Sequence, residues 1–352
     1  MHFENSSKMG EVPDSSVDLI VTSPPYPMIE MWDSLFFQLN PEIKLCFDKK
    51  DFLSSFTLMH DELNKTWIEC ERVLKDGGIA CINIGDATRT LDKDFRLWSN
   101  HTMINKFFML ELKLKPLPII LWRKSTNKPN KFMGSGMLPP SAYVTLEHEY
   151  ILVFRKGDKR EFQNDKEERY EAAFFWEERN NWFSDVWFDI VGTRQNLNGV
   201  NEVLRKRSAA FPLELANRLI NMYSIYQDTV LDPFMGTGTT AIAAMMLQRN
   251  SIGYEIHKDF HDVFVQYLNS LPALSREYNE NRLSKHIDFI ENWDKSPKYK
   301  NKYYDFGVVT SQERNIKLYD VENIAILNDG EIKISYKKHK FKRAAKKKHL
   351  AI

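Results

Sequence analysis

Cysteine, long apolar runs and an excess of either charge are all scarce in this sequence. Its three cysteines, Cys46, Cys70 and Cys81, show no paired spacing and form no metal motif with the scattered histidines, which fits a reducing compartment. No apolar run is long enough to cross a bilayer, and the polar N-terminus lacks the charged and apolar regions of a signal peptide. We therefore expect a cytoplasmic protein with no membrane segment and no bound metal.

The near balance of charges excludes a global electrostatic field as the means of binding a partner. The 352 residues include 49 Lys and Arg against 48 Asp and Glu, a net charge of +1, so any basic surface must be local. With 43% hydrophobic and 28% charged residues, the composition is that of an ordinary soluble globular protein. The length allows a sizeable core and about two domains.

An apolar, β-branched run over residues 17–22 ends at the sequence Ser23-Pro24-Pro25-Tyr26. Such a run is typical of a buried parallel strand, and open α/β sheets bind ligands at the carboxyl ends of such strands. The two prolines have no N–H group, so they end the strand and fix a rigid corner. The serine hydroxyl, the backbone carbonyls and the tyrosine ring suit an exocyclic amine of a nucleobase, with the ring stacked on the base. A rigid turn without chemistry is the alternative that this stretch leaves open.

The first half of the chain alternates predicted helices and strands. Helical spacing of apolar residues predicts a helix over 51–74, which is followed by a buried strand over 79–86. The order strand, helix, strand indicates a parallel unit with a right-handed crossover. A helix over 101–113 and a strand over 117–123 come next. The strand over 149–155 is joined to the preceding strand without a helix, so it should run antiparallel to its neighbour.

A second centre combines an apolar strand over 229–231, a glycine-rich turn and an alanine-rich helix. Glycines let a ligand approach the backbone at the start of a helix. A strand over 251–255 then places the Glu255 carboxylate about twenty residues beyond the glycines, as in sites that bind the ribose of nucleotide-type cofactors. The turn lacks the Gly-Lys-Ser/Thr ending of a phosphate-binding P-loop, which argues against ATP. The candidate binding residues of this turn are Asp232, Pro233, Phe234, Gly236, Gly238, Thr239 and Thr240.

The remaining segments carry weaker signals. Phe211 and Pro212 open a helix with proline at its first position. Amphipathic helices are expected over 257–271 and 275–293, and a hairpin over 324–336. The charged, aromatic segment 157–187 either forms a small satellite core or reads DNA. The basic run at the C-terminus is either a solvated tail or a non-specific contact to phosphates.

Together these residues resemble the S-adenosylmethionine-dependent DNA amino-methyltransferases of the beta class, in which the catalytic motif precedes the cofactor motif. The resemblance covers residues 1–268, with 17–26 as the catalytic motif, 232–238 as the cofactor loop and Glu255 as the ribose-binding acid. It implies a Rossmann-like α/β sheet of seven mostly parallel strands, one of them antiparallel, in permuted motif order and with a small recognition region. The parts it implies are a catalytic half (1–156), an insert with a possible role in target recognition (157–200), a cofactor-binding half (201–271) and a C-terminal extension with a basic tail (272–352).

The resemblance also implies roles for individual residues. Ser23, Pro24, Pro25 and Tyr26 would grip a base flipped out of double-stranded DNA, with Tyr26 stacked on it. A serine hydroxyl is too weak a base to remove the amine proton, so we assign Ser23 to positioning and polarisation. S-adenosylmethionine would contact Asn5, Ser6, Phe211, Pro212, Asp232, Pro233, Phe234, Gly236, Gly238, Thr239, Thr240 and Glu255. The sequence departs from the family at Asn5 and Ser6, where an Asp is frequent, and at 208–209, where His-Pro is common.

In this family, Ser at the first position of the tetrapeptide goes mostly with cytosine N4 as the target, and Asp mostly with adenine N6. We therefore expect direct methyl transfer to the N4 amine of cytosine. Methylation at cytosine C5 is set aside because it needs a cysteine that follows a proline, and Cys46, Cys70 and Cys81 do not. Adenine N6 methylation and a catalytically silent DNA-binding module remain alternatives, with a nicotinamide dehydrogenase as a distant third. A cognate restriction endonuclease, and a monomer or a homodimer, are left open.

Overall fold

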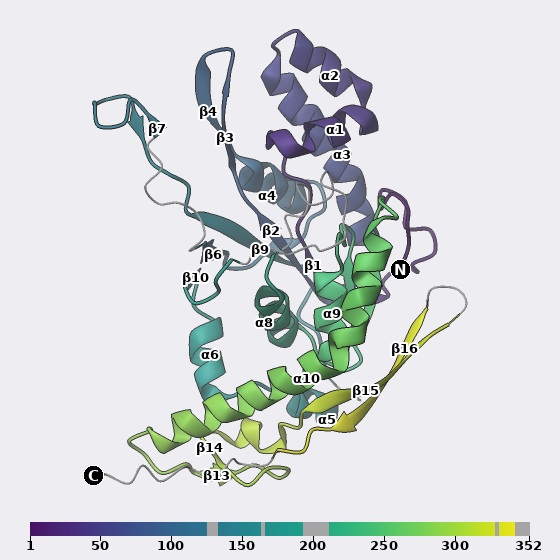
Figure 1. The fold of residues 1–352 in the computed structure, drawn as a ribbon, viewed down its shortest axis with the longest axis vertical. Coiled ribbons are helices and arrows are strands. Elements are labelled where there is room, and N and C mark those ends of the chain that lie inside the picture. The colour runs from purple at the N-terminus through teal and green to yellow at the C-terminus, as the bar shows by residue number, and fades with distance from the viewer. Residues whose placement is uncertain (125–132, 163–165, 193–210, 328–330, 342–352) are drawn as a thin grey trace.

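The computed structural model describes residues 1–124, 133–162, 166–192, 211–327 and 331–341 of the chain. At its centre is a mixed β-sheet with helices on both faces (Figure 1). Its strands are β1 (Val17–Thr22), β2 (Leu74–Ile84), β5 (Lys115–Pro116), β6 (Ile120–Arg123), β9 (His148–Arg155), β10 (Val186–Trp187), β11 (Thr229–Asp232) and β12 (Asn250–Gly253).

Seven of these strands follow one another across the sheet in the order β10-β6-β9-β2-β1-β11-β12, and the short β5 pairs with β9. Strands β2, β1, β11 and β12 are parallel, whereas β9 runs antiparallel to both β2 and β6. The predicted sheet of mostly parallel strands with one antiparallel strand is thereby confirmed, and the strand expected over 149–155 is the antiparallel one.

Two layers of helices bury the central strand. The helices of the described residues are α1 (Asp33–Leu39), α2 (Pro41–Asp48), α3 (Phe52–Val73), α4 (Asn100–Leu110), α5 (Lys166–Glu171), α6 (Trp176–Trp182), α8 (Leu213–Tyr223), α9 (Thr239–Met246) and α10 (Phe260–Glu291), with 3-10 turns η1 (Glu30–Trp32) and η2 (Ser311–Asn315). Side chains of β1 alternate between the layers, as a strand requires. Leu19 and Val21 pack with α8 and α9, and Ile20 packs with α3 and α4. In the part of the chain that the structure describes, we find no helix with the length and apolar character needed to cross a membrane.

The helix starts follow local capping chemistry. The Asp51 carboxylate accepts a hydrogen bond from the Ser54 N–H at 3.2 Å and caps α3 close to the predicted start. Pro212 was expected at the first helical position of α8, but it is the residue before the helix, with an extended ψ of 147°. A proline there still fits, because it lacks the N–H that a helix start would leave unpaired.

The two helices expected over 257–271 and 275–293 are one continuous helix, α10, which contains Pro272 and crosses residue 271. Proline removes one backbone hydrogen bond from a helix interior, and packing on both sides of it offsets that loss here. Leu271 is fully buried before the proline, and Ser275 after it accepts a hydrogen bond from the Val321 N–H at 3.2 Å. Tertiary contacts thus keep the helix continuous at Pro272, although a proline alone would favour a break there.

The aromatic segment 157–187 is divided between two places: its last residues form β10 of the main sheet, whereas the part around α6 packs against the C-terminal extension (Figure 1). Phe175, which is fully buried, shares a small core with Leu283 and Phe306. Beside it, the Arg282 guanidinium donates two hydrogen bonds to the Glu178 carboxylate, at 2.6 and 2.7 Å. This is the satellite core that was one of the two interpretations of the segment.

Three excursions leave the carboxyl edge of the sheet and stand at the same end of the molecule (Figure 1). Helices α1 and α2 follow β1; the hairpin β3 (Ala87–Leu91) and β4 (Asp94–Trp98) follows β2; the hairpin β7 (Met133–Gly134) and β8 (Ala142–Tyr143) follows β6. The last two touch, because the rings of Phe95 and Tyr143 are stacked with centroids 4.7 Å apart. The β3–β4 hairpin was not among the elements predicted from the sequence.

The C-terminal extension contains β13 (Tyr299–Lys300), β14 (Gly307–Val308), β15 (Tyr319–Ile326) and β16 (Ile332–Lys338). Strands β15 and β16 pair antiparallel, which confirms the hairpin predicted over 324–336. The basic tail from residue 342, and the departure from the family at 208–209, lie outside the described residues.

Gly238 provides a test of how the turn before α9 is held. Its φ is +88°, and a Cβ atom there would lie 2.3 Å from Cδ2 of the buried Phe264. We expect Gly238→Ala to lower the free energy of unfolding by about 1–3 kcal/mol, through the strained backbone and the overlap. Urea unfolding measures this loss. Gly10→Ala is the control, because a Cβ at Gly10 meets nothing within 4 Å; equal stabilities of the two variants would contradict the prediction.

Candidate active site

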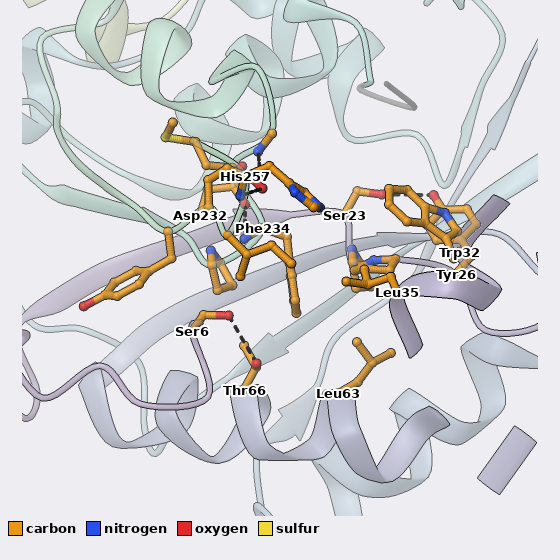
Figure 2. Close-up of a pocket in the computed structure, with 18 of the residues that line it drawn as sticks. Ser6, Ser23, Tyr26, Trp32, Leu35, Leu63, Thr66, Asp232, Phe234 and His257 are labelled. Carbon is orange, nitrogen blue, oxygen red and sulfur yellow. Dashed lines mark hydrogen bonds between the residues drawn. The ribbon is translucent and has the colours of Figure 1, made fainter. Parts of the chain in front are cut away.

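The carboxyl ends of β1 and β11 lie side by side because the two strands pair in parallel, with Ile20 opposite Leu231. The corners that follow them open onto one pocket of about 340 Å³. Figure 2 shows Ser23, Asp232 and Phe234 along this pocket, although more than 200 residues separate the two corners in the sequence.

Most of the residues predicted for catalysis or cofactor binding line this pocket. They are Asn5, Ser6, Ser23, Pro24, Pro25, Tyr26, Phe211, Asp232, Pro233, Phe234, Gly236, Thr239 and Glu255. Pro212, Gly238 and Thr240 are not among the lining residues. Pro212 and Gly238 precede α8 and α9, and the buried Thr240 hydroxyl donates to the Val21 carbonyl at 3.1 Å. These three residues support the corners and do not face the cavity.

The Tyr26 hydroxyl is the centre of a hydrogen-bond network at the end of β1. It lies 3.0 Å from the Ser23 Oγ and donates to the Glu149 Oε2 at 3.0 Å. The Asn83 Nδ2 donates to the same hydroxyl at 2.9 Å and to the Glu149 Oε2 at 2.7 Å. Burial raises the pKa of Tyr26 well above its ordinary value, and the negative charge of Glu149 raises it further. The phenol is therefore neutral at physiological pH.

Asn83, Lys124 and Glu149 are site residues that were not predicted from the sequence. Asn83 is near the end of β2, and Glu149 is near the start of β9; the antiparallel pairing of these strands brings the two side chains together. The Lys124 ammonium forms an ion pair with the Glu149 Oε1. Gly85 leaves room for both groups, because a Cβ atom there would lie 3.0 Å from the Tyr26 ring and 3.2 Å from the Glu149 Cγ.

Asp232 is buried at the end of β11 and joins the two corners. Its Oδ1 accepts hydrogen bonds from the Thr22 hydroxyl at 2.6 Å and from the Phe234 N–H at 3.1 Å. Burial raises the pKa of Asp232 to about 6, since the low-dielectric surroundings disfavour the charged carboxylate. Although the two hydrogen bonds favour the ionised form, they do not offset this effect of burial.

Glu255 closes the glycine-rich turn. Its carboxylate accepts hydrogen bonds from the Gly236 N–H at 2.8 Å and from the His257 N–H at 2.9 Å, and burial raises its pKa. Gly236 has a φ of +52°, and a Cβ atom there would meet nothing within 4 Å. The backbone at Gly236 therefore faces open space in which a ligand can approach closely.

The N-terminal segment forms another wall. A single parallel bridge joins His2 to Tyr254. Behind it, the Ser6 and Thr66 hydroxyls are hydrogen-bonded at 3.2 Å (Figure 2). Apolar side chains that follow the catalytic corner, among them Trp32, line the pocket as well.

Comparisons with known proteins agree with this fold and site. A family model described as DNA methylase, N6_N4_Mtase, matches residues 17–266. The type II methyltransferase M.MthZI of Methanothermobacter thermautotrophicus is 52% identical over 339 residues, which is 96% of this chain and 94% of that protein. The type II methyltransferase M.MjaI of Methanocaldococcus jannaschii is 51% identical over 272 residues, 74% of this chain and 88% of that protein.

A solved structure with the same architecture is that of a putative DNA modification methylase from Thermus thermophilus, determined in complex with S-adenosyl-L-methionine. Its TM-score is 0.60 at 28% sequence identity, and the match covers 77% of this chain and 93% of that chain. The predicted fold class is confirmed by this likeness.

The raised pKa of Asp232 predicts a pH-dependent stability. The carboxyl stays protonated up to about pH 6 in the folded protein but only up to its ordinary pKa of 3.8 in the unfolded chain, so the stability it contributes is lost as pH rises through this window. We expect the free energy of unfolding of wild type, relative to Asp232→Asn, to fall by about 2–3 kcal/mol between pH 4 and pH 7. Urea titrations at several pH values measure it. Ser23→Ala, which changes no titratable group, should keep the wild-type slope; a constant difference between wild type and Asp232→Asn would refute the shift.

Proposed function

The chain belongs to the N6_N4 family of DNA methylases, and from this premise we propose that it methylates the N4 amine of a flipped-out cytosine within a short DNA sequence. The observation that carries the proposal is the meeting of two corners at one pocket. One corner has the acceptors for an amine at Ser23 and a ring at Tyr26, and the other has the Asp232 and Glu255 carboxylates.

S-adenosylmethionine is the cofactor of this enzyme family and supplies an electrophilic methyl group bound to a positively charged sulfur. The second corner fits such a group. Open space at Gly236 leaves room for it, and the Glu255 carboxylate, at the end of the next parallel strand, suits the ribose hydroxyls. Asp232 and Phe234 would contact its methionine end. Among the ion pairs of the described residues none involves Asp232 or Glu255, so both remain available to a cation.

The base would enter from the side of the first corner. Ser23 and the Pro24 carbonyl would accept the N–H groups of the amine, while the Tyr26 ring stacks on the base. Holding the amine in this way orients the nitrogen lone pair and avoids the need for a strong base in the protein. The serine at the head of the tetrapeptide supports cytosine N4 over adenine N6, by its usual association within the family.

Methylated nucleosides test both the activity and the target base. We expect DNA exposed to the wild type and S-adenosylmethionine to yield N4-methylcytosine on digestion, and Ser23→Ala and Tyr26→Ala to reduce the yield by about 100-fold or more. Both variants should still bind the cofactor, because neither side chain belongs to the second corner. Detection of N6-methyladenine alone would transfer the assignment to adenine, and an inactive wild type that still binds DNA would favour the silent DNA-binding module.

We also propose that the hairpin β7–β8 contributes to target recognition and that the insert 157–200 does not. Several observations support this choice. The hairpin stands at the same end of the molecule as the other excursions from the carboxyl edge of the sheet (Figure 1), and its uncharged tip exposes Met137 by 85% and Leu138 by 69%. Apolar side chains of this kind contact base edges or enter base steps in protein–DNA complexes. In the insert, by contrast, Phe175 and Glu178 are held against the C-terminal extension.

Surface variants distinguish these two segments. We expect the double variant Met137→Ser/Leu138→Ser to bind duplex DNA that contains the target site about tenfold more weakly, with unchanged affinity for S-adenosylmethionine. Leu110→Ser, at an exposed apolar residue at the end of α4, is the matched control. Fluorescence anisotropy with labelled duplexes measures the affinities. Loss of binding in Trp176→Ala, but not in the hairpin variant, would place recognition in the insert instead.

A further inference from the structure

In the hydrogen-bond network around Tyr26, the available donors and acceptors determine which group donates in each bond. The Glu149 carboxylate, in an ion pair with Lys124, carries only acceptors. The Tyr26 hydroxyl has one hydrogen, and its distance of 3.0 Å to the Glu149 Oε2 assigns that hydrogen to the carboxylate. Tyr26 therefore has only its oxygen lone pairs left for the side chains of its other two hydrogen-bond partners, Asn83 and Ser23.

Those two neighbours must then donate. The Asn83 amide does so through its Nδ2, at 2.9 Å from the phenol oxygen. Its Oδ1 has no partner among the described residues, and turning the amide round would place that oxygen against the Glu149 carboxylate. The remaining neighbour is Ser23, whose Oγ lies 3.0 Å from the phenol oxygen. A serine hydroxyl has one hydrogen and two lone pairs, so donation to Tyr26 leaves only acceptor capacity.

We propose that Glu149 is a positioning residue that makes Ser23 an obligate hydrogen-bond acceptor toward the amine of the target base. Without this constraint, the serine hydroxyl could rotate and present its hydrogen to the amine nitrogen, whose lone pair must be free to attack. Glu149 fixes the orientation of the Ser23 hydroxyl through a single intervening residue, Tyr26, and has no need to touch the base. The inference rests on the proposed amine methylation and adds a residue outside the Ser-Pro-Pro-Tyr tetrapeptide.

Burial makes the constraint effective. The Glu149 side chain is only 12% exposed and that of Lys124 only 24%, so water competes weakly for these hydrogen bonds. The ion pair also fixes the orientation of the carboxylate, because Lys124 binds the Oε1 atom and leaves the Oε2 atom facing Tyr26. Lys124 thus determines which of the two terminal atoms of a Glu or Gln side chain at position 149 points at Tyr26.

Glu149→Gln reverses the direction while it preserves the size of the side chain. The amide oxygen of the glutamine would face the Lys124 ammonium, and its NH₂ group would face Tyr26. The phenol hydrogen would then lose its carboxylate acceptor and be free to turn to Ser23, which would release the serine hydrogen into the pocket. We expect the single-turnover rate of methylation to fall by about 10- to 100-fold. The Kd for S-adenosylmethionine should change by less than about twofold, because the cofactor would contact the other corner of the pocket.

A second substitution separates direction from packing. With Lys124→Met in the Glu149→Gln background, nothing holds the amide oxygen away from Tyr26, and the donors of Tyr26 and Asn83 both attract it. We expect this double variant to recover at least about tenfold of the lost rate. Glu147→Gln is the control, since it breaks a neighbouring but more exposed ion pair with Arg123, at 2.9 Å and outside the pocket, and should keep the wild-type rate.

Two results would overturn the inference. One is a wild-type rate in Glu149→Gln, which would show that Ser23 needs no imposed direction. The other is a loss that Lys124→Met leaves unchanged, which would show that Glu149 acts only through packing. The ratio of variant to wild-type rates is measured for whichever amine the wild type methylates, cytosine N4 or adenine N6. A product of N6-methyladenine would therefore defeat the cytosine assignment while the role of Glu149 is judged separately.

Discussion

The parallel pairing of β1 with β11 is the constraint on which the rest of the site depends. Its register carries the Thr22 hydroxyl to 2.6 Å from the Asp232 carboxylate, so the last residues of the two strands are bonded to each other. A slip of one residue would turn every side chain of β1 to the other face, so that the residues now packed in one helical core would enter the other. Prolines fix the corner after Thr22, and the glycine turn follows Asp232 directly. Both corners therefore face the same pocket.

The corner at Ser23 comes before the corner at Asp232 in the chain. The half of the sheet formed by β11 and β12 is therefore added late in the sequence. The strands that hold Ser23 and Tyr26 come first, and the β11–β12 pair comes after the insert. The bridge of His2 to Tyr254 returns the N-terminal segment to that late half. Asn5 and Ser6 thereby reach the pocket, so the first residues of the chain and the residues after β11 form its walls together.

The sequence alone was sufficient to predict a part of the site wherever a strand and the corner after it had a recognisable local pattern. The apolar run before Ser23 and the glycine turn after Asp232 were of this kind, and both lie where they were expected. Lys124, Asn83 and Glu149 carried no such signal, because their meeting depends on the antiparallel register of β9, which no short stretch of sequence encodes. The same reason applies to the continuity of α10, in which partners distant in sequence hold a helix that Pro272 alone would have ended.

Charge is divided within the pocket in a way that follows the proposed chemistry. At the end near β1, the charge of Glu149 is paired with that of Lys124, and Tyr26 is held neutral, so an incoming neutral amine meets oriented dipoles and no net field. At the end near β11, burial raises the pKa of both Asp232 and Glu255. A carboxylate that is costly to ionise in the empty pocket is stabilised when a cation arrives, so a positively charged sulfur would be favoured over its neutral product. Such a difference would bind the methyl donor and help to release what remains after transfer.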